Sequence, residues 1–400
     1  MFSAEDIRDD FPILKDIVYL DSAATSLSPR QVVEAQADAE YHIRANVGRG
    51  VHRLGRIATH KFEAARASVK QFFGGGDGTL AFTRNTTEGT NIIAQGIDWH
   101  THDRIIVPLQ EHHSNILPWF GLENAGKIGG VDVVGGTGGV ISVKDIEEAI
   151  TDDTRMIAVG HASNVFGSVA PVKEIGRLCK KHDILFLVDG AQSAPHLPID
   201  LKEIGCDYFS FSGHKMLGPM GIGGLWMAPD APMPAPLYAG GGMVGTVTGH
   251  TFTTAGGAGQ FEAGTPNVIG AIGLAEACRY LQHLGMDAVA AHSEQLARKA
   301  SKELAEIPGV TVYTPDNVQL TGSVSFTVDG VHPHEVAYFL DEAAAIMVRS
   351  GEHCCQPLMH AMLPDRTGGG TVRASVYCYN TEDDIDLLVA TVDEIARMVK

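Results

Sequence analysis

Residues 184–219 read ILFLVDGAQSAPHLPIDLKEIGCDYFSFSGHKMLGP, and this stretch decides the fold. It holds two short apolar runs, Ile184–Val188 and Tyr208–Phe211, with a short helical pattern at LKEIG between them. Runs of this kind that alternate with helices predict βαβ units and a mainly parallel sheet covered on both faces. Ligands bind at the carboxyl ends of the strands in such sheets. The residues that follow the two runs, Asp189 and Lys215, are therefore the first candidates for a site.

The same alternation extends along the chain in both directions. Upstream, the β-rich runs TLAFT, RIIVPL and RMIAVG are each followed by a helical pattern. From Ile269 to about Ile307 the pattern changes to long helices, with apolar residues at helical spacing. Beyond them, VSFTV, IMVRS and TVRASVY predict strands, and helices are expected from Pro333 to Ala345 and from Thr381 to Met398. The tail is therefore expected to be a smaller α+β domain.

Composition narrows the classes of protein to consider. The chain has 400 residues, 44% hydrophobic and 20% charged, which suits a globular protein of two to three domains. A net charge of −18 disfavours nucleic acid or an anionic membrane as partner. The uncharged stretch 231–261 contains eight Gly and three Pro, so no membrane span is expected. Six cysteines without CxxC spacing, behind a charged first segment, predict a cytoplasmic protein.

Asp189 and Lys215 together indicate a specific chemistry. A carboxylate at the end of a buried run needs a cationic or hydrogen-bond-donating partner, although Asp189 alone could be a helix cap, and a loop lysine alone is usually solvated. One short helix separates the two residues, which suits pyridoxal phosphate. The Lys215 amine would form a Schiff base with the aldehyde, and Asp189 would keep the pyridine nitrogen protonated so that the ring withdraws electrons.

The stretch TRNTTEGTN predicts donors for the cofactor's phosphate. Thr86 and Thr87 follow a strand and open a helix, whose free N–H groups and dipole favour an anion. A threonine at this place is also a common helix cap. Ser212 and His214, beside the lysine, offer further donors. A shared phosphate site explains these residues together.

Two clusters resemble metal ligands but fit poorly. His112 and His113 are adjacent in what reads as an extended segment, so their side chains should point to opposite sides, and no third ligand has suitable spacing. One of them could stack on an aromatic ring or move a proton. The cluster from Glu352 to Cys355 is contiguous, which is a poor arrangement for a metal cage. No metal site is expected.

A reactive thiol is expected in the C-terminal part of the chain. Cys354 and Cys355 follow the run IMVRS and are expected on a loop outside the apolar core, near Arg349. The positive charge of Arg349 would favour the thiolate form of the cysteine, whereas the negative charge of Glu352 would disfavour it. The sequence leaves the balance between these two effects open. Arg373 is borne by the strand TVRASVY, where its guanidinium either pairs with a protein carboxylate or clamps the carboxylate of a substrate.

As a set, the motifs resemble the cysteine desulfurase and selenocysteine lyase family of the sulfur-mobilisation (SUF) type, whose members are class V aminotransferase-like enzymes. They follow the family order from Tyr19 to Ser375: YLDSAAT, RGVH, TRNTTEGTN, EHHSNILPW, HASNVFG, VDGAQ, SFSGHK, FEAGTPN, RSGEHCCQPLM and VRAS. The resemblance implies the α/β architecture of a fold-type-I pyridoxal phosphate-dependent transferase. It also implies a homodimer.

That architecture has a large domain with a mainly parallel sheet of seven strands and a smaller C-terminal α+β domain. By resemblance, residues 1–16 are an N-terminal segment that packs with the small domain. Residues 17–268 form the cofactor-binding large domain. Residues 269–400 supply linking helices and the small domain that carries the catalytic cysteine loop.

The resemblance also assigns roles to individual residues. Lys215 is the Schiff-base lysine, Asp189 the partner of the pyridinium nitrogen, His112 the stacking histidine and Gln192 the donor to the ring hydroxyl. The remaining residues fall into two groups. The phosphate ligands are expected to be Thr86, Thr87, Ser212, His214 and, from the neighbouring subunit, Thr265. Asn164, Arg349 and Arg373 are expected at the substrate carboxylate, with Asn164 also beside the cofactor.

Cys354 matches the family's nucleophilic cysteine. Glu352 stands where the family commonly has His, and Cys355 where a small residue is usual, so the activation of Cys354 and any relay of sulfur by Cys355 stay open. The implied reaction converts L-cysteine to L-alanine and leaves a persulfide on Cys354, which passes sulfur to an acceptor protein for iron–sulfur cluster assembly. The alternatives are a selenocysteine lyase or cysteine sulfinate desulfinase on the same scaffold. A non-catalytic sulfur carrier would have no need of Lys215 or Asp189.

Overall fold

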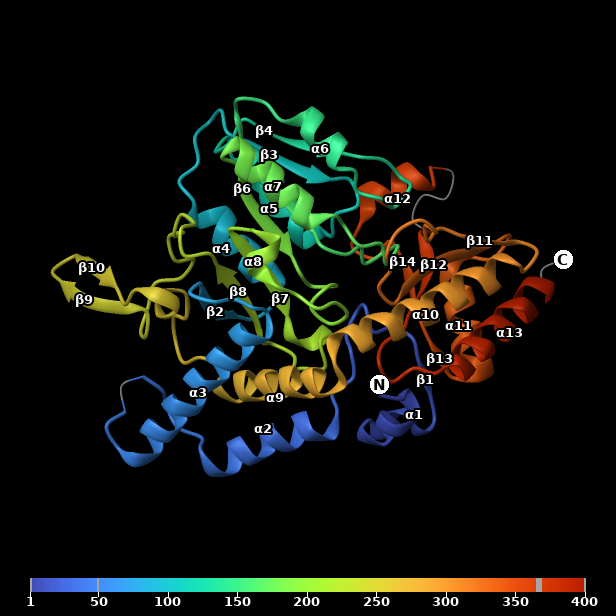
Figure 1. Ribbon diagram of the computed structural model, residues 1–400, viewed down its shortest axis with the longest axis horizontal. Coiled ribbons are helices and arrows are strands. Elements are labelled where there is room, and N and C mark those ends of the chain that lie inside the picture. Colours follow the sequence, from blue (N-terminus) through green and yellow to red (C-terminus); the bar gives the residue numbers. More distant parts are fainter. Residues whose placement is uncertain (1, 49, 365–368, 399–400) are drawn as a thin grey trace.

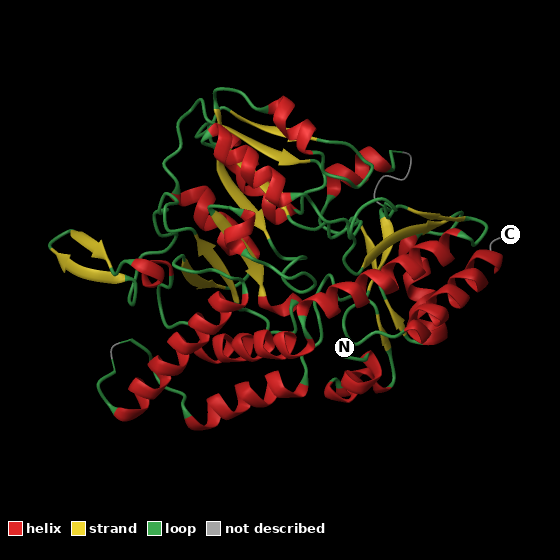
Figure 2. Ribbon diagram, in the orientation of Figure 1, coloured by secondary structure: helices red, strands yellow, loops and turns green. Residues whose placement is uncertain are grey.

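The computed structural model describes residues 2–48, 50–364 and 369–398, so residues 1 and 399–400, at the outer ends of the expected domains, lie outside it. Figure 1 shows two bodies side by side, a larger one with a central sheet and a smaller one formed by the C-terminal part of the chain. Figure 2 shows that helices cover both faces of the larger sheet.

The described residues of the larger body form a seven-stranded sheet in the order β2-β8-β7-β6-β5-β3-β4. β8 runs antiparallel to β2 and β7, and the other neighbouring pairs are parallel. The strands are β2 (Thr79–Thr83), β3 (Arg104–Pro108), β4 (Gly130–Val134), β5 (Thr154–Gly160), β6 (Leu185–Asp189), β7 (Tyr208–Ser212) and β8 (Gly223–Met227). The expected α/β class and mainly parallel sheet are confirmed.

Helices pack on both faces because the central strands are apolar on both sides. The helices of this body are α2 (Arg30–His42), α3 (Arg53–Phe72), α4 (Thr86–Gly96), α5 (His113–Asn124), α6 (Val143–Ala149), α7 (Val172–His182), α8 (Leu201–Ile204) and α9 (Val268–Leu284). In β6, Leu185 and Leu187 join the core under α4 and α5, whereas Phe186 and Val188 join the core under α3, α7 and α9. Alternation along the strand thus fixes both layers.

The smaller body is built on a four-stranded antiparallel sheet, within the described residues, in the order β11-β12-β15-β14. Its elements are α10 (Met286–Ala305), β11 (Val310–Val312), β12 (Ser323–Val328), α11 (Pro333–Ala344), β13 (Ile346–Met347), β14 (Arg349–Gly351), α12 (Gln356–Met362), β15 (Thr371–Ser375) and α13 (Glu382–Met398). Its core, with Phe326 of β12 and Leu388 of α13, is a separate apolar cluster.

We propose a division into two domains on the basis of these cores. α9 packs against α2 and α3, and its buried residues belong to the large-domain core. α10 joins both bodies, because Val289 belongs to the first core and Leu296 to the second. This packing supports a boundary inside α10 rather than at residue 269. Near the N-terminus, Arg8 pairs with Asp384 of α13 at 2.9 Å, which supports the expected packing of this segment on the small domain.

Two further pairs of strands lie outside the main sheets. β1 (Val18–Tyr19) pairs in parallel with β13. β9 (Val244–Thr248) and β10 (Thr251–Thr254) form an antiparallel hairpin that projects from the larger body at the left of Figure 1.

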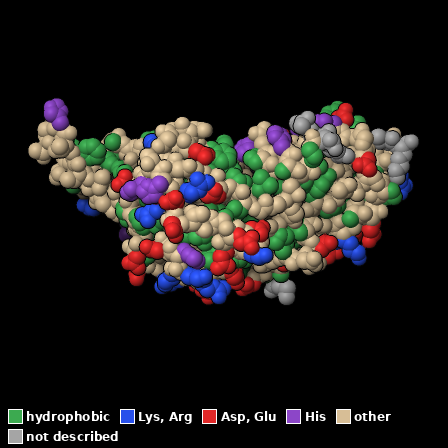
Figure 3. Space-filling view, turned by 90° about the horizontal axis from the view of Figure 1, so that it is seen from above, with side chains coloured by type: hydrophobic (Ala, Val, Ile, Leu, Met, Phe, Trp, Pro, Cys, Tyr) green, Lys and Arg blue, Asp and Glu red, His purple; other side chains and the backbone are tan. Residues whose placement is uncertain are grey.

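The surface carries charge of both signs. On the face drawn in Figure 3, acidic and basic side chains are interspersed in small groups. Among the described residues, the helices include none that combines the length and apolar character needed to cross a bilayer.

Two local expectations differ from the structure. The run IMVRS is not one strand: Ile346 and Met347 pair with β1, whereas Arg349 to Gly351 pair with β15, so the chain changes partner at Val348. His113 is the first residue of α5 rather than part of an extended segment. His112 is the N-cap, and its Nδ1 accepts a hydrogen bond from the Ser114 N–H at 3.0 Å. Histidine as a cap was not evident from the sequence, because Ser, Thr, Asp and Asn are the usual caps.

The packing of α7 on α8 predicts the effect of one added methyl group. A Cβ at Gly176 would lie 2.2 Å from the backbone oxygen of Ile204, which has little freedom to move. We expect Gly176→Ala to lower the free energy of unfolding by about 1–3 kcal/mol. Gly121→Ala in α5 is the matched control, because nothing lies within 4 Å of its added Cβ. The control should keep the melting temperature or raise it slightly. Equal melting temperatures for the two variants would contradict the account.

Candidate active site

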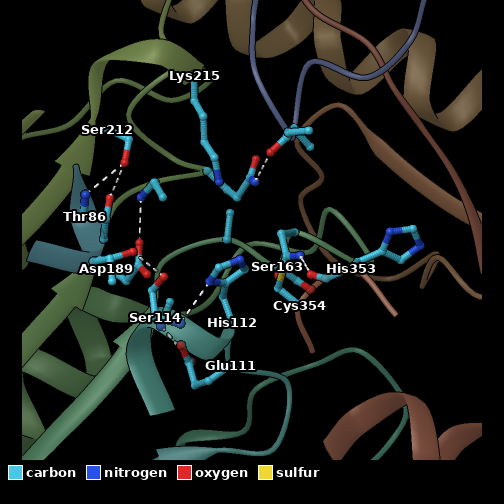
Figure 4. A pocket seen from close by; sticks show the side chains of 18 of the residues that line it. Thr86, Glu111, His112, Ser114, Ser163, Asp189, Ser212, Lys215, His353 and Cys354 are labelled. Carbon is cyan, nitrogen blue, oxygen red and sulfur yellow. Dashed lines mark hydrogen bonds between the residues drawn. The ribbon is translucent and has the colours of Figure 1, made fainter. Parts of the chain in front are cut away.

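A cavity of about 190 Å³ lies where β3, β5, β6 and β7 end, and residues of the small domain form one wall. It brings together all the predicted site residues except Thr265. These are Thr86, Thr87, His112, Asn164, Asp189, Gln192, Ser212, His214, Lys215, Arg349, Cys354 and Arg373. In Figure 4, Lys215 extends from the top toward the centre, Asp189 lies at the left, His112 below and Cys354 to the right.

Lys215 presents an amine to this cavity. It ends the short 3₁₀ turn η3 (Gly213–Lys215), which follows β7 directly. Among the described residues, no hydrogen bond to its Nζ is found. Burial lowers the pKa of Lys215 to about 8, and the positive charges of Arg373 and Arg349 act in the same direction while Asp189 opposes them. Half of the amine is therefore unprotonated at about pH 8, and this is the form that a nucleophile or base requires.

Asp189 lies at the end of β6 and is only 6% exposed. Its Oδ1 accepts a hydrogen bond from the Ala191 N–H at 2.8 Å, and no described residue donates to Oδ2. Burial raises the pKa of Asp189, whereas the Ala191 hydrogen bond and the charge of Lys215 lower it. A buried carboxylate with a free oxygen suits a cationic N–H donor in the cavity. Nearby, Gln192 Nε2 donates to the Ala23 oxygen at 2.8 Å.

The start of α4 forms the end of the cavity suited to an anion. Asn85 caps the helix, and the Thr86 N–H donates to Ser212 Oγ at 2.9 Å. The Thr87 and Ser114 hydroxyls are 2.6 Å apart. Hydroxyls and a helix N-terminus together favour a phosphate group.

His214 lies beside this end of the cavity. Its Nδ1 is 3.2 Å from Thr25 Oγ1. Burial lowers the pKa of His214 to about 4, and the charge of Lys215 adds to the effect. This histidine is therefore neutral at physiological pH and can still donate one N–H.

His112 is a neutral imidazole at the floor of the cavity. Burial lowers its pKa to about 3, and the charge of Lys215 is the next cause. With its Nδ1 accepting from the Ser114 N–H, the ring is fixed in orientation. The arrangement suits contact with a flat ring more than storage of a proton.

Two arginines face the cavity from the small domain. Arg349 and Arg373 are opposite each other in the β14–β15 ladder. Arg373 is 2% exposed, donates from Nη1 to the Asn164 oxygen at 3.0 Å, and pairs through Nη2 with Asp21 Oδ1 at 3.1 Å. Its Nε has no partner among the described residues. Burial lowers the pKa of Arg373 to about 10 against the opposing charge of Asp21, so the side chain remains a cation with a donor to spare.

Cys354 lies in the loop between β14 and α12, half-buried at the cavity wall. Its Sγ is 3.7 Å from Arg349 Nη2, so a positive charge faces the sulfur. Its backbone oxygen accepts from the His113 N–H at 2.8 Å, and Asn164 Nδ2 donates to the oxygen of His353 at 2.8 Å. Both His353 and Cys354 have left-handed backbone conformations, with φ of 51° and 57°. These hydrogen bonds hold a strained loop against the large domain.

The Glu352 carboxylate forms hydrogen bonds with side chains of α12. Its Oε2 accepts from Gln356 Nε2 at 2.6 Å, and Oε1 is 2.9 Å from His360 Nε2. The His353 Nε2 atom is hydrogen-bonded to Thr371 Oγ1 at 2.9 Å, and the ring points away from the centre of Figure 4. The group facing the Cys354 sulfur is therefore Arg349.

The expected place of Cys355 outside the apolar core was wrong. Its side chain is fully buried in a cluster with Val165, Phe166 and Leu358. Burial raises the pKa of Cys355 to about 12. The sequence placed both cysteines on a loop, but the start of α12 turns the second one inward.

Thr265 lies outside this cavity. It is exposed before α9 and lines a different hollow of about 720 Å³, which also contains Arg66 and Glu262. These two form a partly buried ion pair at 2.5 Å, which fixes the neighbouring segment. A role for Thr265 at the site of a neighbouring subunit stays a prediction.

Two acidic residues at the site were missed from the sequence. Asp21, the partner of Arg373, lies within YLDSAAT, and its spacing gave no hint of a contact with β15. Glu111 precedes His112 and lines the cavity while 3% exposed. A carboxylate two residues after the apolar run RIIVPL was a signal of the same kind as Asp189. Among the described residues, no group of three or more His, Cys, Asp or Glu side chains is arranged to hold a metal.

Comparisons with known proteins show which family has this sequence and fold. The family model described as Aminotransferase class-V matches residues 18–388. A probable cysteine desulfurase of Halalkalibacterium halodurans is 42% identical over 96% of both chains, and one of Methanothermobacter thermautotrophicus is 41% identical over 98% of both.

Solved structures agree. An apo cysteine desulfurase of Thermococcus onnurineus superposes with a TM-score of 0.94 at 37% identity, covering 100% of this chain and 99% of that one. The S-sulfonic acid form of the cysteine desulfurase CsdA from Escherichia coli gives 0.90 at 35%, with both chains fully covered.

The different burial of the cysteines predicts their order of reaction. Cys354 is half-buried at the cavity, whereas Cys179, Cys206, Cys278, Cys355 and Cys378 are buried. Brief treatment of the native protein with iodoacetamide should modify Cys354 first, since thiolate character and access govern alkylation. Peptide mass spectrometry checks the site, and urea-unfolded protein, in which all six should react, is the control. Native labelling of Cys355 ahead of Cys354 would refute this description.

Proposed function

The chain belongs to the class-V aminotransferase family and is a cysteine desulfurase, and we propose that it works with pyridoxal phosphate held between Lys215 and Asp189. It converts L-cysteine to L-alanine and passes the sulfur to Cys354. The observation that carries the proposal is that Cys354 Sγ, beside Arg349, shares one cavity with the Lys215 amine.

The residues present fit this cofactor. Lys215 offers an amine without a hydrogen-bond partner among the described residues, and Asp189 offers a free carboxylate oxygen that suits a ring N–H. The hydroxyls at the start of α4 suit the phosphate, and His112 lies where it can contact the ring face. When bound, pyridoxal phosphate supplies an aldehyde for covalent attachment and a protonated ring that withdraws electrons. Gln192 is proposed to contact the ring hydroxyl.

The substrate carboxylate is proposed to bind the arginine wall. Arg373 Nε is a buried donor without a partner among the described residues, which a carboxylate oxygen would satisfy. Asn164 holds the Arg373 guanidinium through its backbone oxygen, and Asp21 holds it from the other side. An amino acid bound there places its Cα near Lys215. The Lys215 amine can then accept and return the Cα proton, as its pKa of about 8 allows.

Cys354 is proposed to take the sulfur. Its thiolate attacks the substrate sulfur, so that an S–S bond forms while the C–S bond breaks and its electron pair stays with the carbon. Protonation of that carbon gives the methyl group of alanine. Arg349 stabilises negative charge on Cys354 Sγ. The persulfide then passes to an acceptor protein, and similarity to cysteine desulfurases supports a role in iron–sulfur cluster assembly.

A homodimer is part of the proposal. Thr265 is exposed and lies outside its own chain's cavity, which leaves it available to the site of a second subunit. The six unpaired cysteines support a reducing compartment such as the cytoplasm.

Mass spectrometry after exposure to L-cysteine tests the role of Cys354. We expect the added sulfur on the Cys354 peptide, because this thiol faces the cavity and Cys355 does not. Cys354→Ser should lower alanine and sulfide release from L-cysteine at least about 100-fold, whereas Cys355→Ser, the matched control, should retain the persulfide.

Two outcomes would go against the role of Cys354. Full activity of Cys354→Ser on L-cysteine would remove this residue from the mechanism. Activity confined to selenocysteine or cysteine sulfinate would favour a lyase or desulfinase.

A further inference from the structure

Glu111 has an unusual setting in the wall of the cavity that we propose for the cofactor. It follows β3 and precedes His112, and its carboxyl group lies below His112 and Ser114 in Figure 4. Oε1 accepts from the Gly160 N–H and Oε2 from Asn115 Nδ2, both at 2.7 Å. One side chain thus ties the end of β5 to the first turn of α5.

The two ends that Glu111 joins carry residues of the site. Gly160 is the residue opposite Asp189 in the β5–β6 ladder. The N–H of His161, the residue after β5, donates to the backbone oxygen of Asp189 at 2.9 Å. At the other end, α5 begins with His112 as its cap.

The fit around the Glu111 carboxyl group is close. A Cβ at Gly160 would be 3.1 Å from Glu111 Oε2, so glycine leaves the room that this contact needs. The hydrogen bonds of Glu111 therefore fix the position of His112, at the floor of the cavity, relative to that of Asp189 at the end of β6.

Glu111 also contacts the nucleophile loop. The Cys355 thiol donates to the Glu111 backbone oxygen at 3.3 Å, and the neighbouring His113 N–H donates to the Cys354 oxygen at 2.8 Å. The segment from Glu111 to His113 is therefore in contact with both β5 and the loop of Cys354.

We propose that Glu111 is a positioning residue of this active site, holding His112 and Asp189 in a fixed relation to each other at the cofactor ring. This inference rests on the proposed function, since it presumes that pyridoxal phosphate occupies the cavity. Among the described residues, Glu111 has no basic partner. A buried carboxylate without such a partner is costly, so the charge of Glu111 depends on pH.

The charge of Glu111 gives the inference a signature. The ionisable groups around Glu111 are Asp189 on β6, the Cys355 thiol, and His112, which follows Glu111 in the chain. Burial raises the pKa of Glu111 to about 8, the hydrogen bonds from Asn115 and Gly160 oppose this, and Asp189 adds to it. When pyridoxal phosphate is bound, the anionic form of Glu111 would favour the protonated form of its chromophore. Removing the charge should therefore move the chromophore's titration to lower pH.

The test compares Glu111→Ala, which removes the bridge, with Glu111→Gln, which keeps the size of the side chain. The glutamine oxygen can still accept from the Gly160 N–H, and its NH2 can donate to Asn115 Oδ1 once the Asn115 amide has turned over. Apoprotein of each is titrated with pyridoxal phosphate, and the visible band of the loaded protein is followed from pH 6 to 9.5. We expect Glu111→Ala to bind the cofactor at least about tenfold more weakly, and Glu111→Gln to restore affinity but lower the pH midpoint by about half a unit or more. Glu123→Gln, at an exposed position on α5, the helix that begins after Glu111, is the control.

The outcomes separate this inference from the proposed function. Wild-type affinity in Glu111→Ala together with a wild-type midpoint in Glu111→Gln overturns the positioning role. A change in either, beyond that of the control, supports it. If the unsubstituted protein itself binds no pyridoxal phosphate, the proposed function fails first. Should Glu111→Ala not fold, the midpoint of Glu111→Gln decides.

Discussion

A carboxylate buried at the end of a β-strand is the constraint on which the site depends. Asp189 follows an apolar strand whose two faces are covered by helices, and such a group is stable there only with cations or N–H donors around it. The parallel pairing of β6 with β7 brings the Lys215 turn to the same edge of the sheet. The ladder that builds the core thus also gathers the groups of the site.

The second half of the site comes from the smaller domain. β14 and β15 place Arg349 and Arg373 opposite each other, and the loop after β14 carries Cys354. Hydrogen bonds from His113 and from Asn164 hold this loop against the large domain. The residues proposed to hold the cofactor thus follow strands of the large sheet, whereas Arg349, Arg373 and Cys354, proposed for the substrate carboxylate and its sulfur, lie on or beside the small sheet. Their arrangement requires both domains to be in contact.

Much of this could be predicted from the sequence because the signals were local. The apolar runs before Asp189 and Lys215 form consecutive strands, and consecutive strands are commonly neighbours in a sheet. What failed depended on long-range contacts. The run IMVRS is divided because its first part pairs with β1 and its last part with β15. Cys355 turns inward because α12 begins there. Asp21 reaches Arg373 across the whole length of the chain, which no local pattern reveals.

The central claim is that Lys215 and Asp189 address two ends of one cofactor ring. A crystal structure of the protein loaded with pyridoxal phosphate tests it most directly. The account predicts continuous electron density from Lys215 Nζ to the former aldehyde carbon, with the pyridine nitrogen within hydrogen-bond distance of Asp189 and the phosphate at the start of α4. A ring bound elsewhere, or one whose nitrogen faces away from Asp189, would contradict it.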